Sequence, residues 1–332
     1  MKKPLTTSQR FFHFYSILYI QNQHQRKVIT VPNAWDAEQI VSARLAKTLI
    51  ETQFPELAPA KISLLGYGFD NTVYQVNDRF VFRFPRRELA VGLLKTENQL
   101  LPSLASQLPL SIAEPIFFGK PNAGYPWPFT GYHYVQGTPP ARLTEEERIQ
   151  SASVLARFLR TLHHYPHLKA QELGVPFDEL NRLDMMKRKQ ALEKYVKQMK
   201  ERNLYSNQGV LEGYVNDIQE IHYQEKNVLV HGDLHIKNMI VDQTNMVSGI
   251  IDWGDVHIGH PAVDLAIAYS FLPPKGRARF FKEYGKVDEE THRLAKWKAV
   301  FTTVVLVAHS YDQGDKQTLE TAIESLNLIF QE

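Results

Sequence analysis

"VLVHGDLHIKNMIV" at residues 228–241, followed by "VSGIIDWGD" at residues 247–255, sets a group of polar side chains between apolar runs. The pattern predicts a strand, a polar loop, a second strand and then the next strand of a hairpin. Asp233 and Asn238 lie in the loop, and Asp252 ends the last apolar run. Asp and Asn are ordinary turn residues, but so many polar residues in one short loop favour a functional site. We expect these three side chains to face one cleft.

The residue types at this site suggest two kinds of chemistry. Two oxygen ligands from separate strands and a further carboxylate suit Mg²⁺ on nucleotide phosphates, because magnesium usually takes one or two protein ligands. The alternative is a metallo-phosphoesterase in which His231, Asp233 and His235 form an H-x-D-x-H cluster, since alternate residues of an extended segment share a face. Such sites need further ligands in Gly-Asn-His and Gly-His-x-His strings, and neither string occurs. Phosphoryl transfer is therefore the favoured interpretation.

Length and composition limit the remaining possibilities. A chain of 332 residues is comfortable for two lobes, since domains usually hold about 100–200 residues. The net charge is +2 on 38 basic and 36 acidic residues, so we expect no nucleic-acid partner. Cysteine is absent, which excludes disulfides and thiolate metal sites.

Residues 1–33 are predicted to be an N-terminal extension. A basic start and the apolar stretch from Phe11 to Ile20 raise the possibility of a signal peptide. The stretch contains His13, no small-residue cleavage site follows it, and it is shorter than the roughly 20 apolar residues of a membrane span. A cytoplasmic protein without membrane attachment is therefore expected.

The rest of the chain predicts an α+β fold with two lobes, residues 34–137 and residues 138–332. The first lobe should contain a helix from Asp36 that closes before Pro55, and three strands in "ISLL", "TVYQV" and "FVFRF". A helix carrying Glu97, the strands "PIFFG" and "GYHYVQG", and a linker from Gly137 to Pro140 follow. Helices are predicted for the second lobe at Thr144–His164, about Asp178–Arg202, Gly209–Tyr223, Val263–Leu272 and twice after Asp288.

These motifs resemble the aminoglycoside phosphotransferase family, within the protein-kinase-like fold. "HGDLHIKN" and "IIDWGD" are similar to its catalytic loop and metal segment. "GYGFDNTVYQVNDRFVFRFPR", "LPLSIAEPIFFGKP" and "FTGYHYVQGTP" resemble, in order, the N-terminal lobe of the branch with aminoglycoside 2″-phosphotransferases, and more distantly macrolide phosphotransferases. The similarity runs from about Asn33 to the helices after Asp264. It implies a small sheet-containing lobe and a larger, mainly helical catalytic lobe.

The resemblance also implies roles for individual residues. Asp233 would accept the proton of the acceptor hydroxyl, and Asn238 and Asp252 would hold Mg²⁺ on ATP or GTP. The other nucleotide-binding candidates are Gly66 and Gly68 in the loop over the phosphates, Arg83 with Glu97, and the hinge residues Tyr132 and Tyr134. Asp264 would brace the catalytic loop, Asp255 would either face the acceptor or cap a turn, and His231 and His235 would be scaffolding.

Two departures from the family pattern stand out. Arg83 occupies the strand position where kinases carry a lysine, with Glu97 as its expected partner, and arginine does not replace lysine without consequence. Ile236 and Lys237 replace the usual Pro-Gly, which puts a charge beside the site that either touches the acceptor or points to water.

The acceptor is predicted less specifically than the reaction. The sequence indicates an O-phosphotransferase of antibiotic-kinase type that acts on a small-molecule hydroxyl. A metabolite kinase for choline, ethanolamine, homoserine or a sugar, and a nucleotide-binding pseudokinase, remain alternatives. The basic stretch "MMKRKQALEKYVKQMKER" at residues 185–202 is either a solvated helix face or part of a pocket for a neutral or anionic acceptor.

Overall fold

The computed structural model describes residues 37–331 except residues 69 and 123. These residues form two compact units. One holds the described residues up to Ala105 together with Ala113–Tyr134, and the other holds Ser106–Ile112 and the chain from Val135 onward. The predicted N-terminal extension, residues 1–33, lies outside the described residues.

The first unit is built on a five-stranded antiparallel sheet in the order β1-β2-β3-β6-β5. Residues Asn77 to Arg79 join β2 to β3. Asn77 and Asp78 are the central residues of a turn closed by the Arg79 N–H and the Val76 carbonyl (3.2 Å), and their φ angles of 52° and 58° are the left-handed values of a type I′ hairpin turn. The three strands predicted from "ISLL", "TVYQV" and "FVFRF" are confirmed, because β1, β2 and β3 contain these segments. The strands are β1 (Ile62–Tyr67), β2 (Asn71–Val76), β3 (Phe80–Pro85), β5 (Pro115–Gly119) and β6 (Phe129–His133). The helices are α2 (Ala43–Gln53), η2 (Pro55–Leu57) and α3 (Glu88–Ala105).

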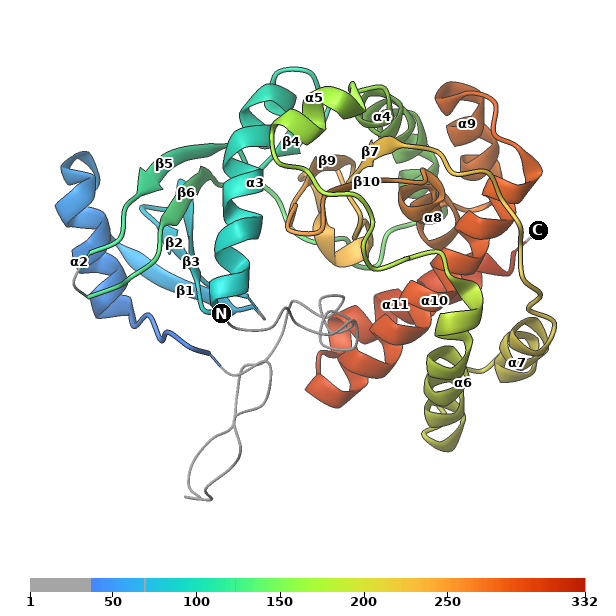
Figure 1. The fold of residues 1–332 in the computed structure, drawn as a ribbon. Helices are drawn as coiled ribbons and strands as arrows, with labels where there is room; N and C mark the ends of the chain where they lie inside the picture. Colours follow the sequence, from blue (N-terminus) through green and yellow to red (C-terminus); the bar gives the residue numbers. More distant parts are fainter. Residues whose placement is uncertain (1–36, 69, 123, 332) are drawn as a thin grey trace. The chain divides into compact units, whose positions relative to one another are not determined.

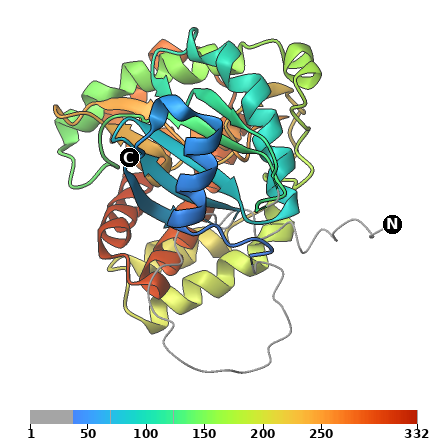
Figure 2. The same ribbon diagram turned by 90° about the vertical axis from the view of Figure 1, so that its left-hand side faces the viewer.

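The two longer helices of this unit cover opposite faces of the sheet, as Figures 1 and 2 show. Phe80, Phe82 and Phe84 alternate along β3 and are buried in one core with α2. Arg83 lies between them, and its side chain therefore points to the other face, where α3 packs. This alternation brings Arg83 to Glu97 of α3.

The first helix begins later than predicted. We expected a start at Asp36, but α2 starts at Ala43, because the Ser42 side chain accepts a hydrogen bond from the Leu45 N–H and caps the helix. Ile40, which the helical spacing included, is exposed.

The second unit is mainly helical. The long helix α10 packs against both α8 and α11, which also contact each other, and it contacts α6, while α4 packs on α9 (Figure 1). None of the helices in the described residues is long and apolar enough to cross a membrane. The helices are α4 (Glu145–His163), α5 (His167–Glu172), α6 (Met185–Glu201), α7 (Gln208–Asn216), η3 (Ile236–Asn238), α8 (Ala262–Phe271), α9 (Pro274–Tyr284), α10 (Glu289–Gln313) and α11 (Lys316–Ile329).

Short strands frame the catalytic-loop motif as predicted, with β7 (Val228–Val230) before it and β8 (Met239–Val241) after it. The other short strands of this unit are β4 (Ser111–Ile112), β9 (Val247–Ile250) and β10 (His257–Gly259). β8 and β9 form the expected antiparallel hairpin, with β4 parallel on the other edge of β9. β7 pairs with β10, a strand the sequence did not reveal. The predicted α+β fold class is confirmed. The predicted ranges of the two lobes remain a prediction. The compact units differ from them at Ser106–Ile112, which belongs with the second unit because it contains β4.

The predicted linker from Gly137 to Pro140 is irregular but anchored, because Thr138 and Val241 exchange backbone hydrogen bonds of 3.0 and 2.8 Å. Two further predictions of local structure were wrong. Helix α6 starts at Met185 instead of near Asp178, since Asp184 caps it. Helix α7 ends at Asn216, short of the predicted Tyr223, and α5 and α9 were not predicted.

Candidate active site

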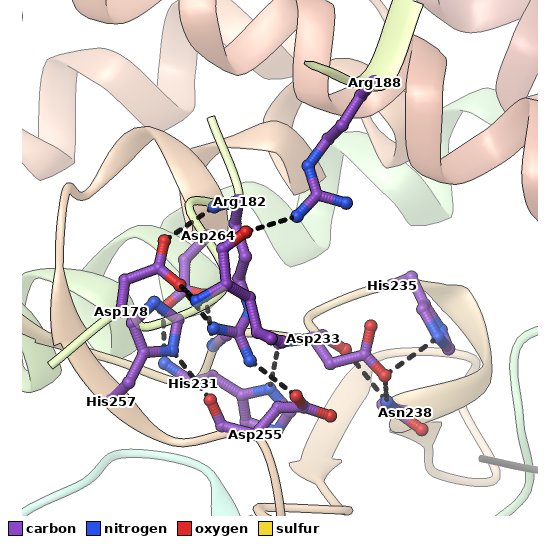
Figure 3. Close-up of polar contacts among 12 residues, drawn as sticks. Asp178, Arg182, Arg188, His231, Asp233, His235, Asn238, Asp255, His257 and Asp264 are labelled. Atoms are coloured by element: carbon purple, nitrogen blue, oxygen red, sulfur yellow. Dashed lines mark hydrogen bonds and ion pairs between the residues drawn. The ribbon is translucent and has the colours of Figure 1, made fainter. Parts of the chain in front are cut away.

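The catalytic-loop motif is held by a buried carboxylate of α8 (Figure 3). Asp264 is fully buried and accepts hydrogen bonds from the backbone N–H groups of His231 (2.7 Å) and Gly232 (3.0 Å). His163 of α4 also lies against it, with Nε2 at 3.2 Å from Oδ2. Burial acts to raise the pKa of Asp264, but these donors outweigh it and the pKa lies below its usual value. Asp264 thus braces the loop, as its position in the motif predicted.

Asp233 lies in this loop with its two carboxylate oxygens in different surroundings. Its Oδ2 atom faces the Asn238 Nδ2 amide at 3.3 Å and the His235 Nε2 at 3.4 Å. Because His235 Nδ1 accepts the Lys237 N–H, the ring proton is on Nε2, toward Asp233. Within the described part of the chain, the buried Oδ1 atom has no hydrogen-bond partner. One oxygen is therefore anchored and the other is left for an external donor.

The electrostatic surroundings keep Asp233 ionised. Burial acts to raise the pKa of Asp233, but His235, Lys298 and His231 together lower it below its usual value. At neutral pH the side chain is a carboxylate, the form that can accept a proton.

Asn238 has an orientation that suits a cation ligand. Its Nδ2 amide donates to the Asp233 carbonyl (2.9 Å) as well as to the Asp233 carboxylate. Its Oδ1 atom is buried and has no protein partner among the described residues. Asp252 follows β9 with a φ of 65°, and the neighbouring Ile251 N–H donates to the Asn238 carbonyl (2.9 Å). Asn238 and Asp252 could thus supply two oxygen ligands to a hard cation such as Mg²⁺.

The contacts of His231 argue against the H-x-D-x-H metal cluster. Its Nδ1 accepts the Asp233 N–H (3.3 Å), and its Nε2 lies 3.1 Å from the Ile251 carbonyl. Both ring nitrogens are therefore engaged within the protein. The described residues also contain no group of three or more His, Asp or Glu side chains placed to hold a metal.

In the first unit, Arg83 and Glu97 form the ion pair that the sequence predicted. Arg83 Nη1 lies 3.1 Å from both carboxylate oxygens of Glu97. The Tyr132 hydroxyl, which is buried, donates to Glu97 Oε2 at 3.1 Å. Burial raises the pKa of Tyr132 well above its usual value, so it remains a donor. The side chain of Tyr132 therefore supports Glu97 from inside the sheet.

The other nucleotide-site candidates have less specific surroundings. A Cβ atom at Gly66 would meet no atom within 4 Å, so the β1 backbone is open there. The Gly68 N–H donates to the Asn71 carbonyl (2.8 Å) in the turn that follows. Tyr134 uses its N–H on the Arg79 carbonyl (2.9 Å). That N–H is hence not available to a ligand as long as the strand pairing persists.

Two features of positive charge noted in the sequence have clear surroundings in the structure. The Lys237 ammonium is bonded to Asp315 at 3.2 Å and does not point freely to water, and Ile236 is buried. The basic stretch on α6 is mostly a solvated face, with Lys187, Lys194 and Lys197 exposed.

Comparison with known proteins identifies the family. The sequence profile of a group described as the phosphotransferase enzyme family matches residues 61–297. The chain belongs to this phosphotransferase family. The family prediction made from the sequence is therefore confirmed.

Solved structures agree with this assignment. The phosphotransferase chain is 25% identical to an aminoglycoside 2″-phosphotransferase solved with GDP and kanamycin, with a TM-score of 0.60 over 86% of this chain and 97% of that chain. A macrolide 2′-phosphotransferase of type I shares the fold, at 19% identity and a TM-score of 0.52, over 87% of this chain and 98% of that one. The kinase-like fold prediction is confirmed. Among curated proteins, the uncharacterized protein YcbJ of Bacillus subtilis (strain 168) is 34% identical over 56 residues, 17% of this chain and 18% of that protein.

The structure of this phosphotransferase also reveals charged residues beside the loop that sequence reasoning missed. Arg182 is buried between Asp178 (2.7 Å) and Asp255 (2.6 Å), so Asp255 forms an ion pair here (Figure 3). Arg188 and Lys298 are also buried. Burial, and next the positive charge of Arg188, lower the pKa of Lys298 to about 7. Asp178 and Arg182 are four residues apart but lie in a turn before α6, so the spacing rule for helices does not apply to them. The ion pair of Arg182 with Asp255 depends on tertiary packing.

Proposed function

We propose that this protein transfers the γ-phosphoryl group of ATP or GTP to a hydroxyl group of a small molecule. The observation that carries the proposal is the buried, ionised Asp233, whose Oδ2 is anchored by His235 and Asn238 while Oδ1 has no partner in the described chain. Such a carboxylate can orient an acceptor hydroxyl and take its proton as the phosphoryl group arrives.

Phosphoryl transfer requires charge neutralisation, and the side chains near Asp233 suit it. Asn238 and Asp252 would hold Mg²⁺, which when bound neutralises charge on the nucleotide phosphates. The fit is supported by the Asn238 amide, whose nitrogen is engaged by Asp233, so that its buried oxygen is presented as a ligand.

In the first unit, Arg83 would bind nucleotide phosphates, with Glu97 and Tyr132 fixing the direction of its guanidinium group. Gly66 and Gly68 would line the phosphates, and the backbone from Tyr132 to Tyr134 would meet the base. GDP in the complex of the aminoglycoside 2″-phosphotransferase supports a purine nucleotide as donor.

We propose that the acceptor is a neutral or anionic compound with a hydroxyl group, in preference to a polycationic aminoglycoside. Kanamycin and other aminoglycosides carry several ammonium groups that must meet carboxylates as they leave water. Asp178 and Asp255 already bind Arg182, and the buried Arg188 and Lys298 add positive charge. A sugar-like or other uncharged or anionic metabolite fits these surroundings better.

The decisive experiment compares the wild type with Asp233→Asn, which keeps the shape of the side chain but removes its basicity. Transfer should fall by about 100-fold or more, the loss expected for a positioned general base, while calorimetry should show Mg²⁺–nucleotide affinity within about twofold. Asp217→Asn, at the end of α7, is the matched control. Transfer at the wild-type rate by Asp233→Asn would contradict the assignment.

The acceptor class is tested by nucleotide consumption with kanamycin, gentamicin, erythromycin, ethanolamine, homoserine and fructose. We expect the aminoglycosides to be poor substrates. A kcat/KM of about 10⁴ M⁻¹s⁻¹ or better with kanamycin, the ordinary range for a true substrate, would contradict the acceptor proposal and leave the kinase assignment intact. Nucleotide binding without transfer to any acceptor or to water would indicate the pseudokinase alternative.

A further inference from the structure

The short turn η3 in the catalytic loop is closed by hydrogen bonds of its own. The Asn238 N–H donates to the His235 carbonyl (2.9 Å), and the Lys237 N–H donates to His235 Nδ1 (3.2 Å). His235 contacts the Asp233 carboxylate from one end of this turn, and Asn238 contacts it from the other (Figure 3). A rotation of the turn would therefore move both side chains that hold Asp233.

The packing beneath the turn is incomplete. Ile236 is buried, but it borders a cavity of about 10 Å³, about the space that one water molecule needs. Thr302 of α10 and Ser325 of α11 also line this cavity, and their buried hydroxyl groups have no hydrogen-bond partner among the described residues. Apolar contacts alone therefore do not fix the turn against these two helices.

A polar contact links the turn to the junction of α10 and α11. The Lys237 ammonium donates to Asp315 Oδ2 at 3.2 Å, and the two side chains are only 15% and 22% exposed. Asp315 is itself fixed, because its Oδ1 caps α11 by accepting the Thr318 N–H (3.1 Å) and its own N–H donates to the Ser310 carbonyl (2.9 Å). Solvent screens such a partly buried pair less than a pair on the surface.

We infer that the Lys237–Asp315 salt bridge positions the turn η3, and with it Asn238 and Asp233, a role that rests on the proposed phosphotransferase function. Lys237 directly precedes Asn238, whose buried amide oxygen is the proposed Mg²⁺ ligand. While Lys237 is held by α11, the turn cannot rotate and this oxygen keeps its direction. The salt bridge is possible because Lys237 stands where the family pattern has a glycine, which has no side chain.

The test is a double-mutant cycle with Lys237→Met and Asp315→Asn. Asn is as good a helix cap as Asp, so Asp315→Asn keeps the cap of α11 and removes only the oxygen that Lys237 binds. Each single change should raise the Kd for Mg²⁺–ATP or Mg²⁺–GTP by about threefold or more, within the range of coupling between contacting residues. The double mutant should differ from either single mutant by less than about twofold, because the salt bridge is already lost.

Titration calorimetry measures these affinities, and single-turnover transfer provides a second measurement. Transfer uses the best acceptor among kanamycin, erythromycin, ethanolamine, homoserine and fructose, or water if none is used. The rate should fall by about fivefold or more in each single mutant and no further in the double mutant. A wild-type Kd and rate in Lys237→Met, or single losses that multiply in the double mutant, would overturn the inference.

A second lysine–aspartate pair provides the matched control. Asp288 caps the start of α10 through Oδ1, and its Oδ2 binds Lys226. The 25 residues of α10 separate the two pairs, a length of about 37 Å at about 1.5 Å per residue. Lys226→Met and Asp288→Asn should lower the melting temperature but leave the Kd and the rate within about twofold. Equal losses of affinity in both pairs would show an effect of stability alone and reject the positioning role.

Lys237→Arg keeps a charged donor and carries the test if Lys237→Met shows no cooperative unfolding. It should bind Mg²⁺–nucleotide more tightly than Lys237→Gln, which is shorter and neutral, and equal affinities of these two variants would reject the role of the salt bridge. If the wild type binds Mg²⁺–nucleotide but transfers phosphate neither to an acceptor nor to water, the proposed function fails and the affinity cycle decides on the salt bridge. If the wild type is active and Lys237→Met matches it, only the role of the salt bridge fails.

Discussion

Asp233 and Asn238 divide their polar atoms between internal and external partners. In each side chain, one atom is bonded inside the loop and the other is a buried oxygen without a partner in the described residues. An unsatisfied buried oxygen costs free energy of folding, about 1–3 kcal/mol for each group. Two such oxygens on neighbouring residues are therefore best explained by ligands that complete them.

A prediction at this scale concerns Arg83. Arg83→Ala should raise the KM or Kd for the nucleotide by about 10-fold or more, because a charge-assisted contact to phosphate is lost. Glu97→Ala should have a similar effect, since Glu97 directs the guanidinium through contacts of 3.1 Å. Arg83→Lys should retain or increase activity, because it restores the family's usual residue.

Titration calorimetry with Mg²⁺ and ATP or GTP measures these affinities, with the exposed Arg79→Ala as control. Unchanged affinity in Arg83→Ala would mean that another group, with Arg86 and Arg87 as the first candidates, binds the phosphates.

At the scale of elements, the loop after β7 depends on one glycine. Gly232 has a φ of +87°, and a Cβ atom there would lie 2.2 Å from the Asp255 carbonyl oxygen. That oxygen belongs to the backbone just before β10. The loop at Gly232 therefore cannot make room for a Cβ atom unless β10 also moves. The close approach lets Asp264 reach the N–H groups on both sides of the turn.

Gly232→Ala should therefore lower both stability and transfer. A left-handed backbone costs about 1–2 kcal/mol for a residue with a Cβ, and the clash adds to this. Gly213→Ala is the control: it lies inside α7 with nothing within 4 Å, and should stabilise the protein by about 0.5–1 kcal/mol. Thermal unfolding measures both. A Gly232→Ala protein as stable and active as the wild type would show that the loop has another conformation.

Local signals predicted the elements whose ends are fixed by their own residues. Helix α4 was placed correctly because Thr144 and Glu147 form a capping box. The start of α6 was misplaced because Asp178 accepts N–H groups of Leu180 and Arg182 in a turn that resembles a helix start. In the site, the loop residues were predictable, whereas the ion pair of Arg182 with Asp255 was not. The two residues lie far apart in the sequence, so local patterns give no sign that they meet.

At the scale of the whole molecule, buried histidines should make stability depend on pH. Burial, and next the charge of Arg182, lower the pKa of His257 to about 3. Its Nδ1 lies 2.7 Å from the Asp255 carbonyl, and its Nε2 is buried with no partner in the described residues. The folded state therefore favours the neutral ring. Its contribution is fully present above the ordinary pKa of 6.5 and is lost as the pH falls toward 3.

The melting temperature should accordingly decrease between pH 7 and pH 4, before most carboxylates titrate at about pH 3.9–4.3. In His257→Asn, which can keep the hydrogen bond to Asp255, the curve should be lower but flatter. The exposed His222→Asn should leave the slope unchanged. If His257→Asn follows the wild-type slope, another group controls the acid sensitivity; the first candidate is His260, whose pKa burial lowers to about 4.

The two-residue strand β4 has a consequence for dissecting the protein. The chain leaves the first unit after Ala105, gives Ser111 and Ile112 to the edge of β9, and returns at Ala113 before it leaves again after Tyr134. A cut after Tyr134 would remove β4 from the second unit, although β4 completes the small sheet of that unit by pairing with β9. A fragment starting at Val135 would expose the edge of β9 and is expected to aggregate. A circular permutant that supplies residues 106–112 in the same chain is the better way to obtain the catalytic half alone.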